Sequence, residues 1–247
     1  MTTTMRSFEP RLLAGKAAAG LTPHRPGDPT GTAPASERST VKRLPDRAAY
    51  DAASVHAVLD AGLVGHVGFV NDGRPIVIPM LYGRDGDVLY LHGSVASRLQ
   101  RTLANGLDVC LTVTIVDGLV MARSAFHHSM NYRSAVVLGR AALVAPADKE
   151  AALRAISEHV APGRWDEVRP PNAVELRQTA VLRLPIEEAS VKARGGGPVD
   201  DPEDVALPVW AGVLPCAVSW AEAVGEPDLP AGVSVPRSVE SRRSKAG

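Results

Sequence analysis

The stretch VGHVGFVNDGRPIVIPML, residues Val64–Leu81, decides the fold class. Two apolar runs, Val64–Val70 and Pro75–Leu81, flank the Asn-Asp-Gly triplet at 71–73. Asparagine, aspartate and glycine tolerate the positive φ angles that tight turns between strands require. The stretch therefore predicts an antiparallel hairpin.

Strand patterns recur at hairpin spacing along the following chain, whereas helical patterns are few. The expected strands are Val88–Leu91, Val109–Ile115, Leu119–Arg123 after a turn at Asp117-Gly118, Tyr132–Val144 and Thr179–Leu184. The expected helices are 51–61, closed by Gly62, then 94–104, begun by Ser94 and closed by Asn105-Gly106, and 148–159, begun by Asp148. A parallel nucleotide-binding sheet needs a helix between successive strands, and most connections here are too short for one. We therefore expect a mainly β protein, a six-stranded antiparallel barrel with peripheral helices.

Composition excludes several classes of function. The 247 residues carry 27 Lys and Arg against 27 Asp and Glu, so no net charge attracts nucleic acid or an anionic membrane. No apolar run reaches the roughly 18 to 20 residues of a membrane-spanning helix. The two cysteines, Cys110 and Cys216, form no CxxC pair, which argues against a disulfide framework or a thiolate zinc site. We expect a cytoplasmic protein that binds neither nucleic acid nor membrane and holds no metal site built from cysteines.

Proline and glycine divide the chain into four parts. Residues 1–44 are expected to form a disordered tail, because prolines interrupt every helical pattern in them. Residues 45–194 form the barrel domain. Residues 195–230 contain the apolar run LPVWAGVLPC, which is expected to pack on the barrel or on a partner subunit, and 231–247 form a second disordered tail.

The segment Leu91–Arg98, LHGSVASR, combines a strand end with an expected helix start. A helix N-terminus offers unpaired N–H groups and a partial positive charge, and Ser94, Ser97 and Arg98 add hydroxyl and guanidinium donors there. This mixture suits a phosphate monoester. A well-capped surface helix with an incidental arginine is the alternative.

A dense polar and aromatic cluster, ARSAFHHSMNYRS, spans Ala122–Ser134 between two expected strands. Loops at barrel rims collect ligand-binding groups. A metal site on His127 and His128 is not expected, because neighbouring residues seldom direct both rings to one ion. Solvated or hydrogen-bonded histidines are the simpler interpretation. Farther along, Trp210 either anchors the C-terminal segment or covers a planar ligand.

Taken together, these features resemble the pyridoxamine 5'-phosphate oxidase-like, FMN-binding split-barrel superfamily, in its branch of flavin-nucleotide-binding proteins related to nitroimidazole reductases. The resemblance covers about Tyr50–Pro215. The motifs that carry it are GHVGFVNDGRPIVIPMLY, LYLHGSVASRL, DGLVMARSAFHHSMNYRSAVVLGRA and PVWAGVLP.

The resemblance implies a homodimer with FMN between the subunits. It places the isoalloxazine ring along one strand and the phosphate at the turn after a later strand, and it adds flanking residues from the long strand and from the C-terminal segment. The residues implied are, for the ring, Val77, Ile78, Pro79, Met80 and Ser134; for the phosphate, His92, Gly93, Ser94, Ser97 and Arg98; flanking these, Asn131, Tyr132 and Arg133, with Trp210 contributed by the partner subunit.

The function that follows is an FMN-dependent oxidoreductase acting through the flavin N5 on a small planar, nitro-aromatic or quinone-like substrate. His128 or Tyr132 is the candidate proton donor, and NADH or NADPH is a candidate reductant that enters the same cleft, because the chain lacks a G-x-G-x-x-G motif. Oxidation of pyridoxamine phosphate is not expected, since the Trp-rich Arg-His signature that holds that substrate is missing from the C-terminal part.

Two other classes of function stay open. In the first, the same barrel holds FMN, a deazaflavin or haem without turnover, with His92, His127 or His128 as haem ligand. In the second, the Pro-rich ends recruit protein partners, which leaves the polar cluster unexplained.

Overall fold

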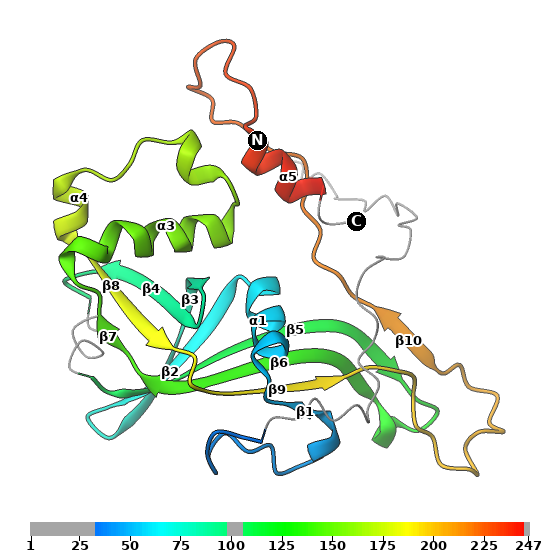
Figure 1. Ribbon diagram of the computed structural model, residues 1–247. Helices are drawn as coiled ribbons and strands as arrows, with labels where there is room; N and C mark the ends of the chain where they lie inside the picture. Colours follow the sequence, from blue (N-terminus) through cyan, green and yellow to red (C-terminus); the bar gives the residue numbers. More distant parts are fainter. Residues whose placement is uncertain (1–32, 98–105, 245–247) are drawn as a thin grey trace, which may run out of the picture.

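The computed structural model describes residues 33–97 and 106–244, and its long strands curve around one core (Figure 1). The strands are β1 (Ala48–Ala49), β2 (Val64–Asn71), β3 (Arg74–Asp85), β4 (Val88–Ser94), β5 (Asp108–Met121), β6 (Ser129–Arg140), β7 (Ala142–Leu143), β8 (Thr179–Pro185), β9 (Glu188–Arg194) and β10 (Gly212–Pro215). The helices are α1 (Ala52–Ala61), α3 (Lys149–Val160), α4 (Ala173–Gln178) and α5 (Arg237–Ser244), with short 3-10 helices η1 (Pro45–Arg47), η2 (Ala125–His127), η3 (Pro146–Asp148) and η4 (Arg164–Glu167). None of the helices within these residues is long and apolar enough to cross a membrane.

The described strands form one antiparallel sheet in the order β1-β9-β6-β5-β2-β3-β4-β8-β7, with β10 added beside β5. β3 joins the two halves of the sheet, because it pairs with β2 as far as Leu81 and with β4 from Tyr82 onward. The expected hairpin is confirmed, with Asp72 and Gly73 at φ 49° and 73° in its turn. The mainly β split-barrel fold is confirmed. The sheet holds ten strands where six were expected, because β9 was missed and the short strands β1, β7 and β10 extend the sheet.

The core lies on the concave face of the sheet. Alternate strand residues such as Val67, Leu111 and Val137 are fully buried there, as the two-residue period of a strand requires. α1 packs against this face through Val55 and Leu59. Its start is fixed by Asp51, whose carboxylate accepts a hydrogen bond from the Ser54 N–H at 2.8 Å.

α3 lies on the opposite face of the sheet, over the second half of β3 and over β4 (Figure 1). The approach is very close, because a Cβ added to Gly83 would lie 2.5 Å from the Cα of Ile156. Only glycine leaves room for a helix backbone at that distance. Gly83 thus sets the position of α3 on the sheet.

Two local expectations were wrong. Asp117-Gly118 is not a hairpin turn: β5 continues through it, with a register shift between Val116 and Gly118 that absorbs the irregularity as a bulge. β9 was missed, because EASVKAR is short and weakly apolar, and it forms a strand by pairing with β6 on one side and β1 on the other. The expected helix 94–104 falls mainly on 98–105, outside the described residues.

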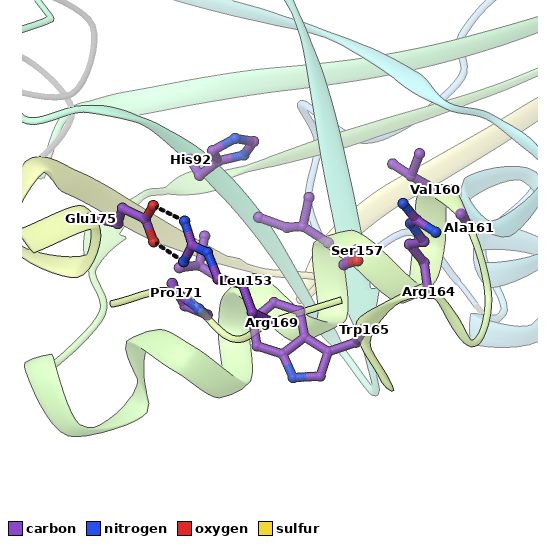
Figure 2. Close-up of a pocket in the computed structure, with 11 residues that line it drawn as sticks. His92, Leu153, Ser157, Val160, Ala161, Arg164, Trp165, Arg169, Pro171 and Glu175 are labelled. Atoms are coloured by element: carbon purple, nitrogen blue, oxygen red, sulfur yellow. Dashed lines mark hydrogen bonds and ion pairs between the residues drawn. The ribbon is translucent and has the colours of Figure 1, made fainter. Parts of the chain in front are cut away.

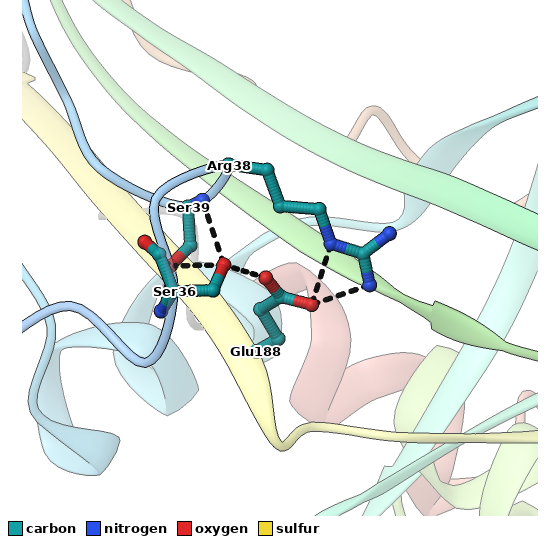
Figure 3. Close-up of polar contacts among 4 residues, drawn as sticks. All are labelled: Ser36, Arg38, Ser39 and Glu188. Carbon is teal, nitrogen blue, oxygen red and sulfur yellow. Dashed lines mark hydrogen bonds and ion pairs between the residues drawn. The ribbon is translucent and has the colours of Figure 1, made fainter.

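Residues 33–44, within the segment expected to be disordered, contact the end of β9. Arg38 donates from Nε and from a terminal nitrogen to Glu188 Oε2 at 2.7 and 2.5 Å, and the Ser36 hydroxyl donates to the other carboxylate oxygen (Figure 3). Ser39 is buried beside them. These contacts tie the start of the described chain to the sheet.

In the second segment expected to be disordered, 231–247, the structure places α5. The buried Ser238 donates from its hydroxyl and its backbone N–H to the Glu167 carboxylate at 2.5 and 3.1 Å. α5 is thereby fastened to η4.

Candidate functional site

The outer face of the β2–β3–β5 sheet is unusually apolar for a surface. Val77 and Leu81 on β3 are 63% and 44% exposed, and Val64 on β2 lies opposite Leu81. Pro79 sits between them on the same face, whereas Ile78 and Met80 alternate to the inner face and pack against the core. Of the four β3 residues expected beside a flavin ring, Val77 and Pro79 therefore present side chains outward.

A pair of hydroxyls lies farther across this outer face. Thr114 on β5 and Ser134 on β6 are Cα partners, and their side-chain oxygens are 3.1 Å apart. β2 and β5 separate β6 from β3, so Ser134 lies about 14 Å from the β3 residues, three inter-strand spacings of about 4.8 Å. Ser134 and Pro79 share a face of the sheet but do not meet within one chain.

The polar cluster between β5 and β6 is held by an acidic segment that sequence reasoning missed. Asp200 accepts hydrogen bonds from the Arg123 N–H and guanidinium, both at 2.7 Å, and Asp201 lies 3.0 Å from His127 Nε2. The signal was available, since Asp200-Asp201 lies two residues after the glycine run at 195–197. In each of the two pairs the partners lie about 75 positions apart in the sequence, so no local pattern indicates the contact.

The candidate proton donors lie near this loop. The ring Nδ1 of His128 accepts a hydrogen bond from the Ala122 N–H at 3.3 Å, so the neutral ring carries its proton on Nε2. His128 is exposed, and Tyr132 on β6 is half-buried. His128 is therefore in the tautomer that can donate from Nε2.

The neighbouring expected residues are held in ionic and amide contacts. Arg133 makes a bidentate ion pair with Asp117 at 2.7 and 2.9 Å, and the hydrogen bond to Asp117 raises the pKa of this guanidinium. Asn131 donates to the Gly196 carbonyl at 3.1 Å and accepts from Arg194 at 2.5 Å. Arg133 is thus positioned at the β5 bulge and is not free to bind an anion.

Trp210 does not anchor the C-terminal segment in the barrel core. The ring is 68% exposed and lies on the backbone of Gly212, where an added Cβ would come within 2.9 Å of it. β10 begins at this glycine and pairs with β5. A large aromatic surface is therefore presented to solvent beside the β5–β6 hairpin.

The expected phosphate turn is described in part. Ser94 is the last residue of β4; its hydroxyl accepts from the Ala96 N–H at 3.2 Å and its carbonyl from the Ser97 N–H at 2.9 Å. Gly93 precedes it on the strand. Arg98 lies outside the described residues, so the anion site remains a prediction.

His92 lies on the face of β4 that α3 covers, and it lines a pocket of about 580 Å³ between β4, α3, η4 and α4 (Figure 2). The walls are apolar, with polar groups at a few points. The lining residues are His92, Leu153, Ile156, Ser157, Val160, Ala161, Arg164, Trp165, Arg169, Pro171 and Glu175. Burial of part of the imidazole lowers the pKa of His92, which favours the neutral ring.

An ion pair closes one side of this pocket. Arg169 donates to both oxygens of Glu175 at 2.6 and 2.9 Å (Figure 2), and Glu175 also accepts from the Asn172 N–H at 2.8 Å. The hydrogen bond from Arg169, followed by that from Asn172, lowers the pKa of Glu175 to about 2. Within 33–97 and 106–244, no group of three or more His, Cys, Asp or Glu side chains is arranged to hold a metal ion.

Comparisons with known proteins identify the family of this chain. A family model described as pyridoxamine 5'-phosphate oxidase matches residues 51–193, more than half of the chain. The chain belongs to this family. Two solved structures are similar to this chain over nearly their whole length. The flavocytochrome Anf3 from Azotobacter vinelandii is 42% identical, and the match covers 84% of this chain and 97% of that chain with a TM-score of 0.80. The FAD and heme binding protein from Mycobacterium smegmatis is 36% identical, and the match covers 79% of this chain and 96% of that chain with a TM-score of 0.77. A search of the curated proteins found no match.

Proposed function

We propose that this member of the pyridoxamine 5'-phosphate oxidase family is a flavin-dependent redox protein that works as a homodimer, with the flavin on the outer face of β2, β3, β5 and β6. The exposed apolar face carries the proposal. Val64, Val77 and Leu81 leave a contiguous apolar surface open in one chain, and such surfaces on soluble proteins mark binding sites. Both similar structures are named as flavin or flavocytochrome proteins.

A second copy of the chain completes the site in this proposal. Pro79 and Ser134 lie on the same face but about 14 Å apart, too far to contact one another. A second subunit placed against this face would cover the apolar side chains and exclude water from a flat cofactor between the sheets. The free energy of association then comes from the same valines and leucine that are exposed in one chain.

The flavin, when bound, supplies hydride and electron transfer through its N5. The chain supplies orientation, through the paired hydroxyls of Thr114 and Ser134, and a shielded apolar surface at Val77 and Pro79. His128 Nε2 and the Tyr132 hydroxyl are the proposed proton donors to the reduced substrate. The substrate is a small planar nitro-aromatic or quinone-like compound, with NADH or NADPH as reductant entering the same cleft.

Haem is the second cofactor we propose, bound in addition to the flavin. The observation that favours it is that the two structures named above, which match nearly end to end, are named for haem or cytochrome as well as flavin. Haem, when bound, supplies one-electron and oxygen chemistry.

The visible spectrum of the purified full chain tests the proposal. We expect two flavin maxima and a Soret band, and we expect the cofactor released by denaturation to be identified by mass. The resemblance favours FMN, whereas the mycobacterial neighbour is named for FAD; either one supports the proposal. A protein that carries no flavin and takes up neither added FMN nor FAD would refute it.

A further inference from the structure

The pocket under α3 has the walls that a flat apolar ligand requires. Leu153 and Val160 from α3 and Pro171 from the following loop form apolar sides, and the indole of Trp165 lies at the edge (Figure 2). A volume of about 580 Å³ falls within the range of about 300 to 1,000 Å³ typical of small-molecule sites. The pocket lies on the helix-covered part of the sheet, not on the exposed face proposed for the flavin.

His92 brings one nitrogen ligand into this pocket from β4. Its side chain has no hydrogen bond or ion pair to any of the described residues. The other described histidines do not line this pocket, and most are engaged elsewhere: His56 with Asp87, His127 with Asp201, His128 with Ala122, His159 with Gly62, and His66 exposed on β2. His92 is exposed in this chain, and its imidazole, without a partner among the described residues, is accessible to a haem iron.

Two arginines lie at the rim. Arg164 and Arg169 have 40% and 68% of their side-chain surfaces exposed, so their guanidinium groups reach solvent while their stems line the pocket. Arg169 is held by both oxygens of Glu175, whereas Arg164 has a single contact with Glu167 at 3.5 Å. An occupant with an apolar flat body and carboxylates at one edge fits this arrangement, with the carboxylates at Arg164.

We propose that haem binds in this pocket, with the His92 imidazole as an iron ligand and Arg164 beside the propionates. The inference rests on the proposed function, since it presumes that the chain carries haem, and it adds the site. The ring would lie between α3 and the loop before α4, with Trp165 beside it. The proposed haem site does not depend on enzymatic turnover, so measurements of haem binding and iron coordination test it.

The experiment is a haem titration of the full-length protein, followed by absorption and electron paramagnetic resonance spectra. We expect His92→Ala to shift or abolish the Soret band and change the iron spin state, and we expect added imidazole to restore the wild-type spectrum. Rescue by free imidazole distinguishes an iron ligand from a residue that only supports the fold. His127→Ala is the matched control and should keep the wild-type haem spectrum.

A second pair of variants addresses the pocket and not the ligand. Ala161→Trp fills the pocket and should prevent haem uptake with flavin retained. Arg164→Gln should weaken haem affinity about fivefold, as expected for losing a partly exposed ionic partner. Haem bound by His92→Ala and by Ala161→Trp with wild-type spectra would overturn the site, even with haem present. A wild-type protein that binds flavin but no haem would instead refute the haem part of the proposed function.

Discussion

Replacing Gly83 with alanine tests whether α3 is held on the sheet by the absence of a side chain. The new Cβ would lie 2.5, 2.6 and 2.7 Å from the Ile156 Cα, the Ile156 nitrogen and the Ala155 carbonyl carbon. All three are backbone atoms of a helix, so no rotamer change relieves the contact, and α3 must move by about 1 Å to reach ordinary contact distance. Overpacking of this kind costs about 3 kcal/mol.

One opposing effect reduces the loss. Alanine restricts the unfolded chain more than glycine does, which stabilises a strand position by about 0.5 to 1 kcal/mol. We therefore expect Gly83→Ala to lower the free energy of unfolding by about 2 kcal/mol. Urea unfolding followed by circular dichroism measures this, with the slope against denaturant checked for constancy.

Gly68→Ala is the matched control in the same sheet. Its Cβ would find the Cys110 carbonyl oxygen at 3.5 Å as the nearest atom, an ordinary contact. The control should stay within about 0.5 kcal/mol of wild type. If Gly83→Ala is equally benign, α3 does not depend on this close approach and the reasoning fails. Displacement of α3 should also reduce haem uptake, because α3 forms one wall of the pocket.

Two further predictions concern stability against pH and assembly. Burial lowers the pKa of His159, opposed in part by the hydrogen bond to the Gly62 carbonyl. As pH falls through about 6.5 the unfolded chain therefore binds a proton first, and the free energy of unfolding declines below that pH. His159→Phe should flatten this decline in urea unfolding measured at several pH values, and an unchanged dependence on pH would contradict the prediction. Val77→Glu puts a charge on the exposed apolar face and should give a monomer by light scattering, with little bound flavin. The control Val224→Glu, at a valine that is 94% exposed, should remain dimeric. A dimeric Val77→Glu protein would locate the interface elsewhere.

The sequence predicted the local elements well where residues act on near neighbours. Asn71, Asp72 and Gly73 specify a hairpin by their own turn chemistry, and Asp51 specifies the start of α1 by capping. β9 could not be found in this way, because its strand state comes from pairing with β6, more than fifty residues earlier. Asp117-Gly118 was wrongly predicted to be a turn for the same reason. β5 continues through these two residues because it pairs with β6 and β10.

In the candidate site too, the sequence could indicate only what neighbouring residues determine. The family resemblance placed His92 among the phosphate ligands, whereas the local pattern pointed to Ser94, Ser97 and Arg98. Its surroundings come from α3, η4 and α4, sixty or more positions later, and no local pattern brings Arg164 or Trp165 to β4. The signal that sequence reasoning could have used is Trp165 beside Gly163-Arg164.

β3 connects the two cofactor sites proposed here. Leu81 and Gly83 lie on the same face of that strand, about 7 Å apart, yet Leu81 is 44% exposed and Gly83 is buried beneath α3. The apolar face proposed for the flavin therefore ends where α3 begins, and the pocket lined by His92 lies under the same helix on the adjoining strand. Backbone hydrogen bonds between β3 and β4, and not a loop, fix the separation of the two sites.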